Sequence, residues 1–372
     1  MTEDPRLFVV RDFATESGAV LPEARLAYRT FGSPDAPRGA VLVPSHFMAG
    51  SADNDFVIGD GLALDPAEFF VVATELLGNG VSSSPSTTPP PFDGPRFPVT
   101  TIRDSVALIR RLLVEELGVD HLAAVVGFSM GAMQAFQLAV SAPGFIDRVV
   151  ALAGTARCTP HGVARLEGQL AALFADPTFA DGDYAEQPAT GIQAFGTVWA
   201  AWLYSQQWWR DELWRESDPD ATFDSTMAAF RDDFLPGADA NDVVLHCRTW
   251  QQHDVGTTPG FDGDTAAALA SITVPVLVMP GATDLYFPAD DARLEARSIP
   301  QATFLPIPSL WGHPAGAGEA PADRDFLNDA IRRFLAGEAI PEAEDLSRGR
   351  GEIERTDDEP VRRPAPGGEA VG

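Results

Sequence analysis

A five-residue pattern at 127–131 constrains the fold of this chain more than any other feature. Gly127-Phe128-Ser129-Met130-Gly131 follows a short apolar run, Leu122 to Val126, and precedes a segment with helical spacing, Ala132 to Ser141. A GxSxG sequence between a strand and a helix is typical of a nucleophile elbow, a sharp turn that lifts the serine side chain out of the backbone. The pattern therefore predicts a parallel sheet with connecting helices, and it makes Ser129 a candidate nucleophile.

A serine hydroxyl needs a base to remove its proton and a carboxylate to orient that base. On folds that carry this elbow, the acid and then the histidine follow the serine, each after a strand. The apolar run Val274 to Met279 is followed by a turn that contains Asp284, and the run Ala302 to Ile307 is followed by a loop that contains His313. We therefore expect Ser129, Asp284 and His313 to form a catalytic triad. The alternative for Asp284 is to cap a helix that starts near Ala289.

The other histidines lack such a setting. His121, His161 and His246 have no carboxylate or serine motif beside them, so we expect them to be surface or core residues. The pair His253-Asp254 resembles a catalytic histidine with its carboxylate. Adjacent side chains point in different directions, however, which favours a structural role.

Acyl transfer through a serine also needs N–H donors for the oxyanion. One is expected from Met130, the residue after the nucleophile, and the other from the loop after an earlier strand. Gly39 to Pro44 is the predicted strand, so Phe47 or Met48 should supply the second N–H. His46 is expected to shape this loop.

The order of apolar runs predicts an α/β fold with a mostly parallel central sheet and helices on both faces. The predicted strands are Arg25 to Phe31, Gly39 to Pro44, Phe69 to Thr74, Leu122 to Val126, Arg148 to Ala153, Val274 to Met279 and Ala302 to Ile307. A helix is expected from Asp104 to Leu117, with Thr101 as its cap.

No strand is predicted between about residues 158 and 270, where the sequence instead has helical segments rich in Trp, Gln and Ala. An insertion of this kind is typical of a helical cap over an active site. The predicted organisation is thus a core in two parts, 1–157 and 271–338, with the cap at 158–270 between them. Residues 339–372 are polar, acidic and rich in proline, and we expect them to form a disordered tail.

Several further motifs resemble the homoserine O-acetyltransferase family, within the α/β-hydrolase fold, over about Ala27 to Phe334. These motifs are Ala27 to Gly32, Ala63-Leu64-Asp65, Phe69 to Val72, Phe97 to Asp104, Ser129 to Gln134, Thr155-Ala156-Arg157, Gly182-Asp183-Tyr184 and His253 to Gly256. The resemblance implies an α/β-hydrolase fold with an inserted cap, a dimer formed through cap helices, and a reaction in which the serine takes an acetyl group from acetyl-CoA and passes it to homoserine.

Three departures from that family argue against homoserine as the acceptor. Ala132 replaces the second glycine of the family's SMGGMQ elbow, and Pro314 follows His313 where the family has an aspartate. Tyr204-Ser205 aligns with the family's Tyr-Arg pair, which by this resemblance would hold the amino-acid carboxylate. Losing both charges removes the contacts that a zwitterionic acceptor needs.

We therefore expect a serine acyl-enzyme that hydrolyses a small ester or thioester, without a metal or bound cofactor. The first alternative is acetyl-CoA-dependent O-acyl transfer to homoserine or another alcohol, and the second is a non-catalytic binding module with a hydrolase fold. The predicted substrate pocket includes Tyr204, Trp202 and Arg157. If CoA is the donor, Arg157 and Arg165 are the candidates to hold its phosphates.

Composition limits the partners of the chain. Its 372 residues contain 26 Lys plus Arg against 54 Asp plus Glu, a net charge of −28, with no lysine at all. The charge disfavours nucleic acid, and the missing lysine excludes Schiff-base chemistry through a protein amine. Cys158 and Cys247 have no metal-ligand spacing. Without a signal-peptide pattern or a long apolar run, we expect a cytoplasmic protein with no membrane partner.

Overall fold

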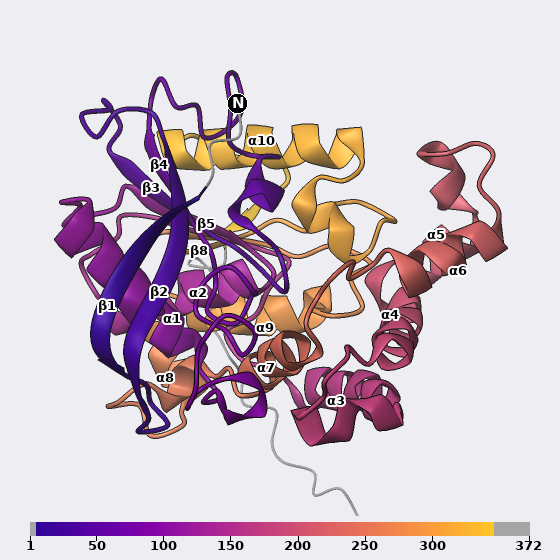
Figure 1. The fold of residues 1–372 in the computed structure, drawn as a ribbon. Coiled ribbons are helices and arrows are strands. Elements are labelled where there is room, and N and C mark those ends of the chain that lie inside the picture. Colours follow the sequence, from indigo (N-terminus) through magenta and orange to yellow (C-terminus); the bar gives the residue numbers. More distant parts are fainter. Residues whose placement is uncertain (1–4, 346–372) are drawn as a thin grey trace, which may run out of the picture.

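The computed structural model describes residues 5–345, and their centre is a nine-stranded sheet in the order β1-β2-β4-β3-β5-β6-β7-β8-β9 (Figure 1). The strands are β1 (Arg6–Ala14), β2 (Val20–Phe31), β3 (Ala40–Pro44), β4 (Phe70–Thr74), β5 (Ala124–Phe128), β6 (Val149–Leu152), β7 (Val276–Met279), β8 (Ala302–Phe304) and β9 (Glu344–Asp345). Strands β3 to β8 run parallel, whereas β1, β2 and β9 pair antiparallel with their neighbours. The predicted mostly parallel sheet is therefore confirmed.

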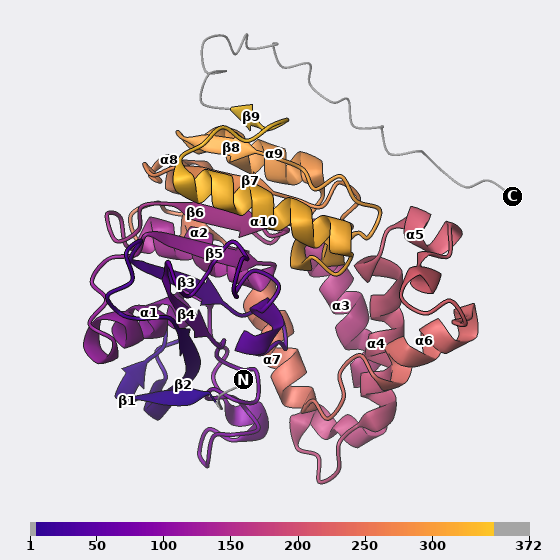
Figure 2. The ribbon, with the colours of Figure 1, turned by 90° about the horizontal axis from the view of Figure 1, so that it is seen from above.

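Each parallel strand is buried on both faces, as its unbroken apolar sequence requires. One face packs on α1 (Ile102–Arg111), α2 (Met130–Ser141), α8 (Thr265–Ala270) and α9 (Ala289–Ser298), and the other packs on α10 (Pro321–Ala336). Within β6, Val149 belongs to the first layer and Val150 to the second, as the period of two along a strand demands. Figure 2 shows α10 and α2 on opposite sides of the sheet.

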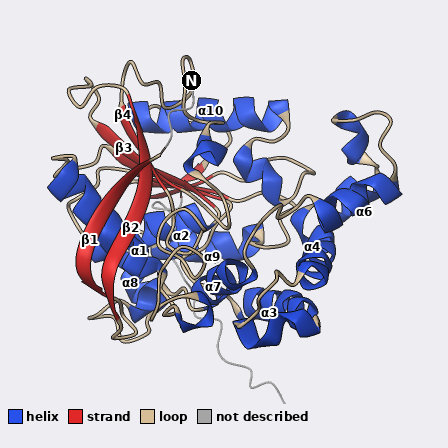
Figure 3. Cartoon of the chain, viewed as in Figure 1, coloured by secondary structure: helices blue, strands red, loops and turns tan. Residues whose placement is uncertain are grey.

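Strand β1 was not predicted. Phe8, Val10 and Phe13 face the core, while Leu7 and Val9 are exposed at 51% and 44%. This alternation is the signal of a half-buried antiparallel strand, and a search for continuous apolar runs passes over it. The hairpin β1-β2, on the left in Figure 3, lengthens the sheet at the edge opposite to β8 and β9.

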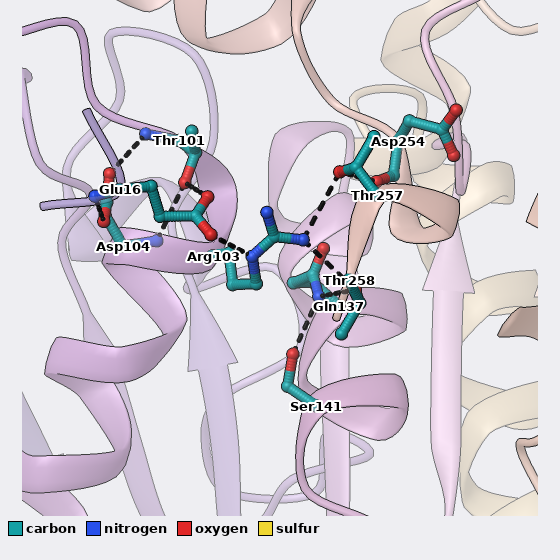
Figure 4. A network of polar contacts seen from close by, with 9 residues as sticks. All are labelled: Glu16, Thr101, Arg103, Asp104, Gln137, Ser141, Asp254, Thr257 and Thr258. Carbon is teal, nitrogen blue, oxygen red and sulfur yellow. Dashed lines mark hydrogen bonds and ion pairs between the residues drawn. The ribbon is translucent and has the colours of Figure 1, made fainter. Parts of the chain in front are cut away.

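Helix α1 begins at the predicted cap. Thr101 Oγ1 accepts the N–H of Asp104 at 3.1 Å, and the Asp104 carboxylate accepts the N–H of Thr101 at 2.9 Å. The α-helical part ends at Arg111 and a π-turn continues to Glu116, slightly short of the predicted end. In Figure 4, Arg103 extends from this first turn between the Glu16 carboxylate and the segment 255–258, so it ties α1 to the chain that leads into α8.

The segment between β6 and α8 is mainly helical and lies to one side of the sheet, over the carboxyl ends of the strands (Figure 2). Its helices are α3 (Pro160–Phe174), α4 (Ala189–Leu203), α5 (Gln206–Arg210), α6 (Phe223–Asp232) and α7 (Ala240–Gln251). Helix α8 lies inside the predicted cap range, yet it packs on α2 and α9 against the sheet. We propose that the cap runs from 158 to about 251 and that α8 belongs to the core.

The core also extends past the predicted start of the tail. Strand β9 pairs with β8 through Glu344 and Phe304, so part of 339–372 is a sheet edge. The remainder of the predicted tail, 346–372, lies outside the described residues. Among the helices of residues 5–345, none has the length and apolar character that a membrane span needs.

Candidate active site

The nucleophile elbow forms where β5 turns into α2. Ser129 has φ 55° and ψ −120°, a strained conformation for a residue with a side chain, as the elbow requires. A Cβ on Gly127 would lie 2.1 Å from the carbonyl oxygen of Gly131, and a Cβ on Gly131 would lie 2.5 Å from that of Pro44. Both glycines are therefore needed for the turn to close and to pack against the end of β3.

Ala132, which differs from the family's glycine, is accommodated by a second glycine. A Cβ on Gly154 would lie 2.4 Å from the Ala132 methyl and 2.7 Å from the carbonyl oxygen of Ser129. The missing side chain of Gly154, just after β6, therefore leaves the space that the Ala132 methyl occupies.

The structure brings Ser129, His313 and Asp284 together in one hydrogen-bonded line. His313 Nε2 lies 3.0 Å from Ser129 Oγ, and His313 Nδ1 lies 2.8 Å from Asp284 Oδ2. All three residues are buried, with exposed fractions of 2% for Ser129, 4% for Asp284 and 5% for His313. When Nδ1–H donates to the carboxylate, Nε2 is left to accept the serine proton.

Backbone contacts fix the carboxylate of Asp284. Its Oδ1 accepts the N–H groups of Tyr286 at 2.7 Å and Phe287 at 3.3 Å, so Oδ2 is turned towards His313. Helix α9 does begin at Ala289, but Pro288 occupies its N-cap position and no side chain caps it. The capping alternative for Asp284 is therefore wrong.

Aromatic rings hold the imidazole of His313. Its ring centroid lies 4.6 Å from Tyr286, 4.8 Å from Phe128 and 5.5 Å from Phe287. The loop itself is drawn close to the cap, because a Cβ on Gly312 would lie 2.8 Å from the backbone at the end of α4. Apolar packing thus restricts the ring to the plane that serves both hydrogen bonds.

Three backbone N–H groups are candidates for the oxyanion hole. Met130 is the first residue of α2, where backbone N–H groups have no partner within the helix. Met48 is not the second donor, because its N–H is donated to His246 Nδ1 at 3.0 Å. The N–H of Phe47 has no hydrogen-bond acceptor among residues 5–345. Of the two residues that the sequence left open, Phe47 is therefore the one we propose.

Two further histidines, His46 and His246, lie at the loop after β3, and the sequence indicated the role of only the first. His46 packs edge-on against Phe128 at 4.8 Å, and burial and the nearby His313 lower its pKa to about 3, in keeping with a role in loop shape. The contact of His246 with Met48 of the oxyanion loop, Ser45 to Gly50, was not predicted from the sequence, because the two residues lie 198 positions apart. No local motif could have indicated it.

The His253-Asp254 pair has structural partners. The backbone oxygen of His253 accepts the N–H of Cys158, and Asp254 Oδ1 accepts from Gly256 N at 2.7 Å and Thr265 Oγ1 at 2.7 Å. Burial lowers the pKa of His253 to about 3. The pair therefore anchors the return of the chain from cap to core, as expected.

The residues predicted for the substrate pocket have other partners. Arg157 pairs with Asp254 at 3.3 Å, and the ring of Trp202 lies 5.4 Å from His161. Tyr204 donates to Glu319 Oε1 at 3.0 Å. In the described part of the chain, none of the three has a hydrogen bond or ring contact with Ser129 or His313. A role for them next to the reacting atoms is thus not supported.

Most cap tryptophans pack on one another. Trp208 stacks on Tyr204 at 3.7 Å and contacts Trp209 and Trp214 at 4.9 Å and 5.6 Å. Trp199 is different, because its ring lies 4.8 Å from Phe47 of the oxyanion loop and 5.4 Å from Tyr286. Trp199 is therefore a better candidate than Trp202 for a wall of the acyl site.

Arg165 is buried and does not form a surface site for CoA phosphates. Only 4% of it is exposed, and its guanidinium lies 4.0 Å from the ring centre of Tyr286, 4.6 Å from Trp250 and 5.4 Å from Trp199. Burial lowers its pKa. The cation is stabilised by the aromatic faces.

The two cysteines are buried free thiols. Burial raises the pKa of Cys158 to about 11 and that of Cys247 to about 12, so neither supplies a thiolate nucleophile at neutral pH. Ser129 is therefore the better candidate for covalent chemistry.

The steric role of Gly131 gives a first prediction. Gly131→Ala should lower the free energy of unfolding by roughly 1–3 kcal/mol, because the new methyl would contact the backbone of β3. It should also reduce kcat/KM by about 100-fold, since the oxyanion loop begins at the displaced residue Ser45. Urea unfolding and an ester assay measure both effects.

Gly168→Ala is the matched control. Its Cβ would meet nothing within 4 Å on helix α3, so it should stabilise by about 0.5–1 kcal/mol with activity unchanged. A Gly131→Ala protein as stable and active as the parent would contradict the close packing.

The fold and this geometry agree with comparisons to known proteins. Residues 41–315 match the family model of the alpha/beta hydrolase fold, and the chain belongs to that family. It is an enzyme by that membership and by its relatives, which include esterases and homoserine O-acetyltransferases. The sequence motifs predicted the similarity to the acetyltransferases.

Two curated relatives and one solved structure illustrate the range. The chain is 36% identical to an ethyl acetate hydrolase of Pseudomonas veronii over 87% of this chain and 93% of that protein. It is 29% identical to a homoserine O-acetyltransferase of Chlorobium chlorochromatii over 87% and 93%. The structure of the acetyl esterase MekB superposes with a TM-score of 0.86 at 31% identity, covering 90% of this chain and 97% of that one.

Proposed function

We propose that this protein hydrolyses small esters of short acyl chains, acetyl esters above all, through an acyl-serine intermediate. The observation that carries the proposal is the hydrogen-bonded line from Asp284 through His313 to Ser129 at the end of the elbow. The similarity to an ethyl acetate hydrolase and to an acetyl esterase supports the acetyl group.

In the first half-reaction, Ser129 Oγ attacks the ester carbonyl while His313 Nε2 takes the hydroxyl proton. The carbonyl oxygen becomes an oxyanion, which the N–H groups of Met130 and Phe47 stabilise. The C–O bond to the alcohol then breaks, and His313 returns the proton to the departing alcohol. An acyl group remains on Ser129.

In the second half-reaction, water attacks the acyl-serine. His313 Nε2 accepts a proton from the water, the same two N–H groups bind the second oxyanion, and the bond to Ser129 Oγ breaks as the proton returns to it. The products are a carboxylic acid and the free serine. Asp284 keeps the ring oriented and stabilises its charged form throughout.

The residues around the site favour water over homoserine as acceptor. Ser205 occupies the position at which the acetyltransferases carry an arginine, and the hydroxyl of the adjacent Tyr204 is already bonded to Glu319. Pro314 stands beside the base in place of an aspartate. An amino-acid acceptor would thus lose partners for both of its charges, whereas water needs none of them.

A single comparison of acceptors tests the proposal. The purified protein is incubated with p-nitrophenyl esters of increasing acyl length and, separately, with acetyl-CoA in the presence or absence of homoserine. We expect fast hydrolysis of the acetyl ester, a decline with acyl length, and slow CoA release that homoserine does not change. CoA release that depends on homoserine, with acetylated product, would instead establish the transferase.

The binding-module alternative is tested by covalent labelling. A fluorophosphonate reacts only with an activated serine, so we expect stoichiometric labelling of Ser129, located by mass spectrometry. An unlabelled, folded protein would rule out the acyl-enzyme and favour a non-catalytic role.

A further inference from the structure

A buried histidine of the cap, His246, holds the loop that carries the second oxyanion donor. It lies on α7, and none of its surface is exposed. Its Nδ1 lies 3.0 Å from the N of Met48, and its Nε2 lies 3.1 Å from the carbonyl oxygen of Leu77. One imidazole therefore joins the loop after β3 to the loop after β4.

The two partners determine the protonation of the ring. A carbonyl oxygen can only accept, so Nε2 carries the hydrogen that is donated to Leu77. Nδ1 is then free to accept the N–H of Met48. Burial lowers the pKa of His246 to about 4, so the ring stays neutral and keeps this arrangement at neutral pH.

The residue held in this way has a strained backbone. Met48 has φ 51°, in the left-handed region that residues with side chains rarely adopt. Such a conformation persists only where the surroundings fix it, and the bond to His246 is one such constraint. The neighbouring bonds are from Ser45 N to Thr74 O, from Ala49 N to His46 O, and from Gln134 Nε2 to Ser45 O.

The turn at Met48 determines the direction of the peptide before it, which carries the N–H of Phe47. The ring of Phe47 packs against side chains of α4 and α7. Its centre lies 4.8 Å from that of Trp199, 5.7 Å from that of His246 and 6.1 Å from that of Trp250. Gly78 makes room for the imidazole, because a Cβ there would lie 2.9 Å from His246 Cδ2. The loop is therefore fixed by both its backbone and its side chain.

We propose that His246 is a positioning residue for catalysis: by binding the N–H of Met48 it holds the turn in which the N–H of Phe47 stays unpaired for the oxyanion. The inference rests on the proposed function. It also assigns the cap a part in transition-state stabilisation, since α7 supplies the group that orders the core loop.

The three substitutions His246→Leu, His246→Asn and His246→Gln separate the two bonds. The Asn Oδ1 can replace Nδ1 as the acceptor for Met48, whereas the Gln Nε2 can replace the donor to Leu77. The Leu side chain replaces neither. If the bond to Met48 is the one that matters, the Asn variant should keep most of its activity while the Gln and Leu variants lose theirs.

We expect kcat for an acetyl ester to fall by about 100-fold in the Leu and Gln variants, with KM within about twofold, because an oxyanion donor acts in the transition state. The affinity for a trifluoromethyl ketone, which forms a tetrahedral adduct with the serine, should fall in parallel. Thr249→Val is the control, since it removes a buried bond from the same helix to the Thr100 carbonyl. It should leave kcat and inhibitor affinity unchanged.

The outcomes distinguish this inference from the proposed function. Equal kcat values for the Asn and Gln variants, or a folded Leu variant with parental kcat, would overturn the role of His246 while leaving the hydrolase intact. Should the Leu variant fail to fold, the Asn and Gln comparison still decides the matter. If the proposed function itself is wrong, the Ser129→Ala protein should still hydrolyse esters.

Discussion

Replacement of Ser129 by alanine is expected to lower kcat/KM for an acetyl ester by on the order of 10⁵-fold or more, because no other group can form the acyl-enzyme. The fold should be retained, since alanine has the same backbone limits as serine at the observed φ of 55° and removes only a hydroxyl whose partner is His313. Steady-state kinetics and thermal unfolding measure the two effects.

Ser141→Ala provides the control for this substitution. Ser141 ends the same helix α2, and its hydroxyl accepts a hydrogen bond from Gln137 at 2.7 Å. Twelve helical residues correspond to about 18 Å, which separates it from the reaction. This variant should match the parent in activity. A Ser129→Ala protein that hydrolyses esters at the parental rate would exclude the covalent mechanism.

The central part of the site was predictable because it follows from strand order. Ser129, Asp284 and His313 each follow a parallel strand, and the carboxyl ends of parallel strands meet at one edge of the sheet. Apolar runs mark those strands without any knowledge of the turns between them. Residues far apart in the chain could therefore be placed together from the sequence.

The second oxyanion donor could not be identified from strand order. The sequence could locate the loop at Phe47 and Met48, but the choice between them depends on a single acceptor from α7, which lies in the cap. Helix α7 approaches the loop through tertiary packing, for which no spacing rule exists. A histidine on an apolar helix looks the same whether it fills space or holds a neighbouring turn.

The substrate pocket is not fixed by a sequence signal of this kind. Tyr204 is a candidate because it aligns with the family's Tyr-Arg pair, and Trp202 is a candidate because aromatic residues in a cap often line a pocket. In the structure Tyr204 is used to bind Glu319 and to stack on Trp208, so it packs the cap together. Aromatic content indicates that a cap has a core of its own, but the direction of each ring depends on helix rotation.

A second variant with a large expected effect is Asp284→Asn, because the contacts of its two oxygens predict how the amide will lie. The N–H groups of Tyr286 and Phe287 require an acceptor, so the amide oxygen should take the place of Oδ1. The amide nitrogen would then face His313 Nδ1 and donate to it. This forces the proton onto Nε2, which can no longer accept the hydrogen of Ser129.

The expected result is a fall in kcat of roughly 10⁴-fold with KM little changed, measured with an acetyl ester. Asp104→Asn is the matched control. Asp104 is also a buried carboxylate that accepts two backbone N–H groups, from Glu16 at 2.9 Å and Thr101 at 2.9 Å, but it lies at the start of α1. That variant should keep its activity while losing some stability. A loss of only a few fold on Asp284→Asn would mean that packing against Tyr286, Phe128 and Phe287 alone orients the histidine, and that the carboxylate is not needed to select its tautomer.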